Sequence, residues 1–251
     1  PSFIMSDKKS PARSATPKDL TAPTSDSASV DAFIRQARAV AATRTQGQGG
    51  KGRIVLALDA TMSRQPTWDL ACSLQAEMFD AVGKSGDLEV QLVYFRGFDE
   101  CRASKFVSDT ASLKSLMTRI DCRGGHTQIG KVLSHALKVT ERDRVNALVY
   151  IGDALEENVD DLADKAGRLG LKGVPVFVFQ EGRDPVAEQG LKEIARFSKG
   201  AWFRFDQSSA ATLARLLSAV AVYATGGLKA LAARGTAEDR LLIENMRGKG
   251  G

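Results

Sequence analysis

The feature that most constrains the fold is a regular alternation, from Arg53 onward, between short apolar runs and longer segments of helical period. The apolar runs are rich in Val, Ile, Leu and Phe, and such runs are typical of strands buried on both faces of a parallel sheet. They cover residues 54–58, 88–95, 147–151, 174–179 and 201–205. The sequence therefore predicts a sheet of buried strands joined by longer connections.

Each segment between these runs carries one apolar stripe at a spacing of three or four residues, which predicts an amphipathic helix. The stripes comprise Leu70, Leu74 and Phe79; Leu113, Leu116, Met117 and Ile120; Ile129, Val132, Leu133, Ala136 and Leu137; and Leu162, Ala166 and Leu169. Asp184 followed by Pro185 has the form of a helix cap and first turn. A long closing helix is expected over residues 208–224.

Strands that alternate with helices imply right-handed crossovers. They predict a doubly wound α/β fold, with a mostly parallel central sheet and helices on both faces. Residues 101–107 are an exception, because they follow the second strand after only a short turn at 97–100. We expect them to form one antiparallel edge strand.

The length of 251 residues and the hydrophobic content of 43% suit one main domain with tails. Residues 1–28 are rich in Ser, Thr, Pro, Lys and Asp, a composition that predicts a disordered tail. Residues 29–52 are expected to form a short amphipathic helix and a glycine linker. The main domain is placed at 53–226, and a helical C-terminal extension and tail at 227–251.

Composition and charge argue against several functional classes. The net charge of +5 is modest and scattered, so no nucleic acid partner is expected. The three cysteines form no Cys-x-x-Cys pair, which disfavours a disulfide framework and a zinc site. Neither the apolar run of a signal peptide nor the roughly 20 apolar residues of a membrane helix is found. A soluble, cytoplasmic protein without membrane insertion is expected.

Polar side chains gather where the predicted strands end, which is where ligands bind in sheets of this kind. Asp59 ends the first strand, and Thr61 and Ser63 follow at alternate positions, so that all three can face the same way. Asp153 follows the fourth strand, and Thr127 comes after paired glycines just before a predicted helix. Two carboxylates and three hydroxyls suit a hard cation, with Mg²⁺ as the first choice and Mn²⁺ or Ca²⁺ as alternatives.

This order of residues resembles the metal-ion-dependent adhesion site (MIDAS) of von Willebrand factor A (VWA) domains, as found in integrins and in many bacterial proteins. The family pattern is Asp-x-Ser-x-Ser, then a distant Thr, then a distant Asp. It is matched by Asp59-Ala60-Thr61-Met62-Ser63, Thr127 and Asp153, within a resemblance that spans about residues 53–222. Thr61 stands where the family usually has Ser, and it keeps the hydroxyl group.

The resemblance implies a Rossmann-like VWA fold and a non-catalytic module that recognises an acidic side chain of a partner protein through the bound ion. It implies that Thr61 and Ser63 bind the ion directly, and that Asp59 and Asp153 act largely through coordinated water. Thr127 would bind directly or through water. In the family a long C-terminal helix can shift on ligand binding, and the helix expected at 208–224 holds that place.

Further residues flank the predicted site. Arg64 and Arg123 could steer an acidic ligand toward the ion, or they could be ordinary solvated arginines. His126 could line the rim that contacts a partner, or it could face solvent. The acidic run Glu156, Glu157, Asp160 and Asp161 would repel an acidic partner or compete for the ion unless these side chains point away.

Two other functions remain open. A Mg²⁺-dependent phosphohydrolase of the haloacid-dehalogenase type also places an aspartate after its first strand, but it needs a second acid two residues later, where this chain has Thr61. A metal-free scaffold would make its contacts through the tail and the helix at 29–43. Because no nucleophile and base pair is evident, we predict a binding protein and not an enzyme.

Overall fold

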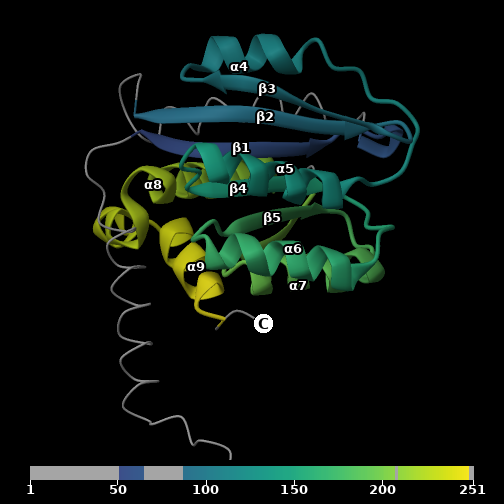
Figure 1. Cartoon of the computed structure of the whole chain (residues 1–251). Coiled ribbons are helices and arrows are strands. Elements are labelled where there is room, and N and C mark those ends of the chain that lie inside the picture. Colours follow the sequence, from purple (N-terminus) through teal and green to yellow (C-terminus); the bar gives the residue numbers. More distant parts are fainter. Residues whose placement is uncertain (1–50, 65–86, 207–208, 249–251) are drawn as a thin grey trace, which may run out of the picture. The chain divides into compact units, whose positions relative to one another are not determined.

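The computed structural model describes residues 51–64, 87–206 and 209–248 (Figure 1). Three predictions concern residues outside these ranges. They are the tail at 1–28, the amphipathic helix and all but the last residues of the linker at 29–52, and the helix with Leu70, Leu74 and Phe79.

A six-stranded sheet runs through the described part of the chain, in the order β3-β2-β1-β4-β5-β6. Its strands are β1 (Gly52–Asp59), β2 (Leu88–Arg96), β3 (Glu100–Val107), β4 (Ala147–Gly152), β5 (Val176–Glu181) and β6 (Ala201–Phe205). Neighbouring strands are parallel except β2 and β3, which are antiparallel with a register shift between Gln91 and Val93. The predicted, mostly parallel sheet with one antiparallel edge strand is confirmed.

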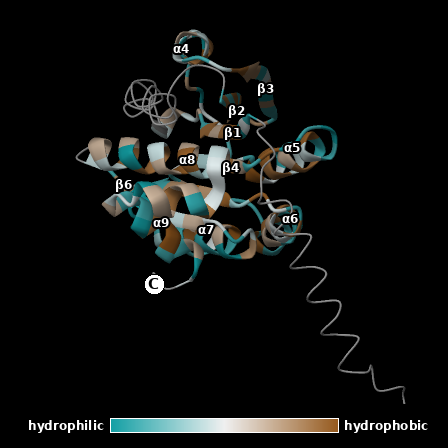
Figure 2. Cartoon of the chain, turned by 90° about the vertical axis from the view of Figure 1, so that its left-hand side faces the viewer, coloured by the Kyte–Doolittle hydropathy of each residue, from teal (hydrophilic) through white to brown (hydrophobic). Residues whose placement is uncertain are grey.

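Helices cover both faces of the sheet, and Figure 2 shows α5 and α6 on one side of it and α8 and α9 on the other. The first face packs against α5 (Ile129–Arg142), α6 (Val159–Leu171) and α7 (Pro185–Phe197), and the second against α4 (Thr110–Met117), α8 (Ala210–Arg234) and α9 (Ala237–Met246). Alternate residues of β1 divide between two cores: Val55 faces α5, and Leu56 faces α8. Burial on both faces explains the mostly apolar runs of the sequence.

The helices after β4 and β5 begin at polar caps. Asn158 Oδ1 accepts a hydrogen bond from the N–H of Asp160 at 2.9 Å, and Asp184 Oδ1 accepts one from the N–H of Val186 at 2.8 Å. Such bonds satisfy backbone donors that have no partner within the helix. The predicted Asp184–Pro185 helix start is correct.

The closing helix α8 runs from Ala210 to Arg234 with a break at Gly227, so the helix predicted at 208–224 corresponds to the part before the break. Gly227 has a non-helical backbone with φ +66°, where the helix kinks, and glycine adopts this conformation without steric cost. After the kink Leu231 is fully buried, and Leu242 of α9 lies in the same core as the sheet. The chain after the kink is therefore held by the core that α8 forms with the strands.

α8 also corrects the expectation that no segment could cross a membrane. By length and composition alone this helix is long and apolar enough to do so. However, 44% of its most apolar stretch is buried inside the fold, where Leu213, Leu217 and Val220 pack in the core of the sheet. A buried core helix has the same length and hydropathy as a membrane span, so these two properties do not distinguish them.

Candidate metal centre

The candidate site lies at the point where the strand order reverses. The chain runs from β1 outward to β2 and β3, and then returns to β4 on the other side of β1. In the parallel pairing of β1 with β4, Leu58 lies opposite Ile151. Asp59 and Asp153 therefore follow directly at the carboxyl ends of two adjacent strands, which is where open α/β sheets bind ligands.

The segment after β1 brings three of the predicted ligands together. Asp59 is 1% exposed, and its Oδ1 accepts a hydrogen bond from the N–H of Thr61 at 2.8 Å. The hydroxyl oxygens of Thr61 and Ser63 lie 3.1 Å apart. The extended segment expected here is instead a short 3₁₀ turn, η1 (Met62–Arg64), but the turn still places the two hydroxyl groups side by side.

A second loop, residues 122–128, lies against this segment. The N–H of Arg123 donates to the carbonyl of Ala60 at 3.0 Å, and the N–H of His126 donates to the carbonyl of Gly97 at 3.2 Å. A Cβ atom on Gly125 would lie 2.0 Å from the carbonyl oxygen of Gly97, so only glycine allows this close approach. The loop is thus held between the ends of β1 and β2.

Thr127 connects this loop to the segment after β4. Its hydroxyl accepts a hydrogen bond from the N–H of Glu156 at 3.0 Å, and its own N–H donates to the Glu156 carboxylate at 2.9 Å. Thr127 is 6% exposed. The predicted ligands thus come from three segments that are joined to one another by hydrogen bonds and by strand pairing.

One carboxylate oxygen of Asp153 is buried without a hydrogen-bond partner among the described residues. Its Oδ1 is shielded from solvent and has no hydrogen-bond partner within the described ranges. Leaving a buried carboxylate oxygen unsatisfied is energetically costly, and a bound cation would satisfy it. This observation, together with the all-oxygen set of nearby side chains, fits a hard divalent cation.

The first two residues of the acidic run after Asp153 bind backbone N–H groups at and just before the start of α5. The Glu156 carboxylate binds the N–H of Thr127, and the Glu157 carboxylate accepts a hydrogen bond from the N–H of Gly130 at 2.8 Å in the first turn of α5. Burial raises the pKa of Glu157 above its ordinary value, although the bonds from the α5 backbone oppose this shift. Asp160 and Asp161 are exposed in the first turn of α6. Competition for the ion, one of the outcomes considered from the sequence, is therefore disfavoured for Glu156 and Glu157, whose carboxylates bind backbone N–H groups.

The predicted rim residues have different surroundings. The Arg123 side chain is 58% exposed and forms an ion pair with Asp121 at 2.9 Å. His126 is 62% exposed, and its Nδ1 lies 3.2 Å from the Glu156 carboxylate. Arg64 ends η1, and its side chain lies outside the described residues.

Sequence analysis missed two apolar neighbours of the site. Met62, between the two hydroxyl residues, is 59% exposed, and Phe98, in the turn after β2, is 77% exposed. The Phe98 ring meets the His126 ring edge-on, with centroids 5.2 Å apart. The sequence could have indicated them, because both are large apolar residues in loops whose other side chains are mostly polar.

The site has few charged ligands. Within the described ranges no group of three or more His, Cys, Asp or Glu side chains is arranged to hold a metal ion. The candidate set therefore depends on hydroxyl groups as well as on Asp59 and Asp153. The position two residues after Asp59, where a phosphohydrolase of the haloacid-dehalogenase type needs an acid, holds Thr61.

No family model and no curated protein matches the sequence, but many solved structures match the fold. A von Willebrand factor type A protein from Catenulispora acidiphila superposes with a TM-score of 0.56 at 17% identity, over 70% of this chain and 43% of that one. An aerotolerance-related membrane protein from Bacteroides fragilis gives 0.52 at 18% identity, over 79% of this chain and 100% of that one.

Proximal thread matrix protein 1 from the mussel byssus, in a form with a zinc-occupied MIDAS motif, gives a TM-score of 0.55 at 22% identity. The match covers 69% of this chain and 45% of that one, so this chain spans less than half of the mussel protein and of the Catenulispora protein. At these identities the likeness concerns the fold. The described part of the chain has the fold of von Willebrand factor A domains.

Proposed function

We propose that this protein is a non-catalytic, metal-dependent binding module that recognises a carboxylate of a partner protein through a divalent cation at the β1–β4 edge. The observation that carries the proposal is the buried Asp153 Oδ1, which lacks a hydrogen-bond partner among the described residues. It lies where the Asp59 segment and the Thr127 loop meet the end of β4. A bound cation would be the partner that this oxygen lacks.

Asp59, Thr61, Ser63, Thr127 and Asp153 would hold the ion. With only two carboxylates in the set, the ion would keep net positive charge and open positions, which a carboxylate from a partner could fill. Oxygen ligands of this kind favour Mg²⁺ or Mn²⁺, with Ca²⁺ as an alternative. The zinc-occupied MIDAS of the mussel protein supports a divalent ion at this place in the fold.

The rim suggests what surrounds that carboxylate. Met62 and Phe98 are exposed apolar side chains on the two segments that flank the site, and His126 contacts Phe98. An acidic residue with an apolar neighbour would bind the ion and cover this apolar surface at the same time. Arg64 and Arg123 would contribute to steering an acidic partner.

Calorimetric titration of the full chain with Mg²⁺ and Mn²⁺ tests the metal. We expect Asp153→Asn and Asp59→Ala each to weaken metal binding at least about tenfold, because each removes a charged ligand. Asp161→Asn, an exposed aspartate outside the site on α6, is the matched control and should bind as the wild type does. Equal affinity for wild type and Asp153→Asn, or no binding to the wild type, would contradict the proposal.

A phosphatase assay in Mg²⁺ tests the enzymatic alternative. We expect the protein to hydrolyse a phosphomonoester such as p-nitrophenyl phosphate no faster than buffer alone does. Turnover that Asp59→Asn abolishes would overturn the non-catalytic assignment, because the reaction would then depend on the candidate site.

A further inference from the structure

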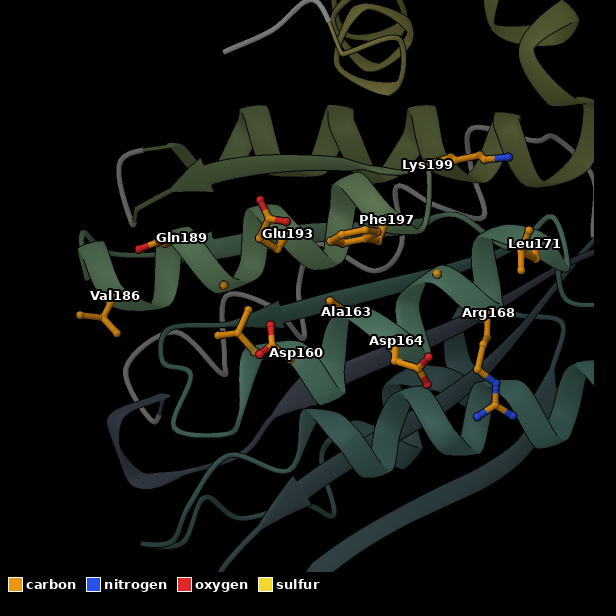
Figure 3. A pocket seen from close by; sticks show the side chains of 13 residues that line it. Asp160, Ala163, Asp164, Arg168, Leu171, Val186, Gln189, Glu193, Phe197 and Lys199 are labelled. Atoms are coloured by element: carbon orange, nitrogen blue, oxygen red, sulfur yellow. The ribbon is translucent and has the colours of Figure 1, made fainter. Parts of the chain in front are cut away.

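A groove of about 970 Å³ lies between α6 and α7 and includes none of the candidate metal ligands (Figure 3). Its lining residues recur every three or four positions from Val159 to Leu171 on α6 and from Val186 to Phe197 on α7. Residues with this spacing share one face of a helix. The groove therefore follows the outer faces of both helices over their whole length, about 20 Å.

This face exposes large apolar side chains. Leu171 is 80% exposed, Val186 is 70% exposed and Phe197 is 43% exposed, and all three line the groove. Figure 3 places Val186 at one end of the groove and Leu171 at the other. Exposed large apolar side chains along one groove are typical of a surface that another molecule covers.

Gly167 in the middle of α6 is not explained by packing against residues that the structure describes. A glycine inside a helix is less stable than an alanine, so it usually needs a reason. At Gly167 an added Cβ would meet nothing within 4 Å, whereas at the neighbouring Gly190 it would meet Leu155 at 2.7 Å. Gly190 thus packs closely against Leu155, but Gly167 leaves open space at the surface of the groove, where an occupant could approach closely.

Charged side chains along the groove are divided by sign except for Glu193 of α7, which forms an ion pair with Arg196. Asp160 and Asp164 lie toward the beginning of α6, and Arg168 and Lys199 lie toward the other end (Figure 3). In the described part of the chain none of these four side chains takes part in an ion pair, although many other surface charges do. The groove therefore presents one acidic end and one basic end, both available to an occupant.

The backbone of Lys199 is a second unusual feature of the groove. It follows the cap of α7 with φ +62°, a left-handed conformation that is usually occupied by glycine at this place after a helix. It is the one non-glycine residue with positive φ among the residues that the structure describes. Its side chain lines the basic end of the groove.

We propose that the occupant is a second copy of this chain, with two α6–α7 faces paired antiparallel about a twofold axis. The two faces have complementary charges in this arrangement. An antiparallel pair sets Arg168 and Lys199 of each copy over the acidic end of the other copy. The same pairing brings Phe197 and Leu171 of one copy toward Val186 of the other. The small side chains of Ala163 and Gly167 lie midway along α6, where the two copies would approach most closely. A face that complements itself is what a twofold interface requires.

The size of the face predicts a weak dimer. Two helices about 20 Å long and about 10 Å wide give a face of roughly 400 Å², well below the roughly 800 Å² per partner of a standard stable interface. We therefore expect a dissociation constant of roughly 10 to 100 μM, weakened by salt. The pairing does not involve the metal site, so it should be the same in Mg²⁺ and in EDTA.

Sedimentation equilibrium of the full chain over about 5 to 500 μM tests the proposal. The double variant Asp160→Lys, Asp164→Lys should be monomeric, and so should Arg168→Glu, Lys199→Glu, because each puts like charges opposite each other. An equimolar mixture of the two variants should form a heterodimer. A wild type that stays monomeric at every concentration, or a dimer that both double variants retain, would refute the proposal.

Two further variants separate pairing from folding. Gly167→Ala should not lower the thermal midpoint, because its Cβ meets none of the described residues, but it should weaken the dimer at least about tenfold by blocking close approach. Asp161→Lys changes the same charge on the same helix at a position that does not line the groove, and it should dimerise as the wild type does. Loss of dimer in Asp161→Lys, or full dimerisation of Gly167→Ala, would contradict this geometry.

Discussion

The two adjacent glycines of the 122–128 loop give a sharp test of how the candidate metal centre is held. At Gly125 an added Cβ would lie 2.0 Å from the carbonyl oxygen of Gly97, 2.3 Å from its carbonyl carbon and 2.5 Å from its Cα. All three are backbone atoms, so no side-chain rotation can relieve the contact. At Gly124 an added Cβ meets nothing within 4 Å, and the backbone φ of Gly124 is not positive.

Gly125→Ala must push the loop away from β2 by roughly 1.5 Å to restore ordinary van der Waals contact. This movement would break the hydrogen bond from the N–H of His126 to the carbonyl of Gly97, now 3.2 Å. Overpacking costs about 1 to 3 kcal/mol and a lost hydrogen bond about 1 kcal/mol. The expected loss of unfolding free energy is about 3 kcal/mol, or about 6 to 12 °C in Tm for a domain of this size.

Thermal unfolding followed by circular dichroism measures this loss, and Gly124→Ala is the matched control. It should leave Tm unchanged or raise it slightly, because alanine restricts the unfolded chain more than glycine does. Because Thr127 lies two residues after Gly125, the Gly125 variant should also weaken metal binding by the proposed centre. A Tm of Gly125→Ala within about 2 °C of the wild type would refute the close approach of the two loops.

Three other predictions concern titratable side chains that are not among the candidate metal ligands. Asp239 is fully buried and accepts hydrogen bonds from Arg234 and from the N–H of Thr236. Burial opposes ionisation of Asp239, but these bonds outweigh it and hold the Asp239 pKa below its ordinary value. Its stabilisation should be present above about pH 4 and be lost as the pH falls through the folded pKa, and Asp239→Ala should cost about 3 kcal/mol in urea unfolding at pH 7. Burial, with Arg142 and Lys138, lowers the pKa of His135, so the unfolding free energy should fall as the pH drops below about 6.5, and His135→Gln should flatten this dependence. Glu157→Ala should cost about 1 to 2 kcal/mol by removing the cap of α5, and Glu141→Ala, an exposed glutamate of that helix, should change the urea midpoint little.

The strands could be predicted from the sequence because burial on both faces leaves mostly apolar runs. The run at 201–205 coincides with β6, and the run at 88–95 misses only the last residue of β2. The start of α7 was predictable because Asp184 and Pro185 act locally. The break in α8 lies at residue 227, where the C-terminal extension was expected to begin, but the kink itself was not predicted, since the two glycines at 226–227 permit a kink without requiring one.

The candidate site was predictable to the level of the segments that carry it. Asp59 and Asp153 follow adjacent strands as expected, but the orientation of Glu156 and Glu157 depends on backbone N–H groups that lie nearly thirty residues earlier in the chain. No local pattern contains that information. The α6–α7 groove was hidden for a different reason: helical periodicity marks the buried face, and it does not reveal how the outward faces of two helices combine.

The three segments at the carboxyl edge of the sheet meet only after β1, β2 and β4 have assembled, so no short fragment of the chain contains the whole constellation. An ion held there would bind the native domain and not the denatured chain. At a free concentration one hundred times its Kd, such an ion would add about 2.7 kcal/mol to the unfolding free energy. Local cation levels would then govern how long the protein survives heat or proteolysis, in addition to governing what it binds.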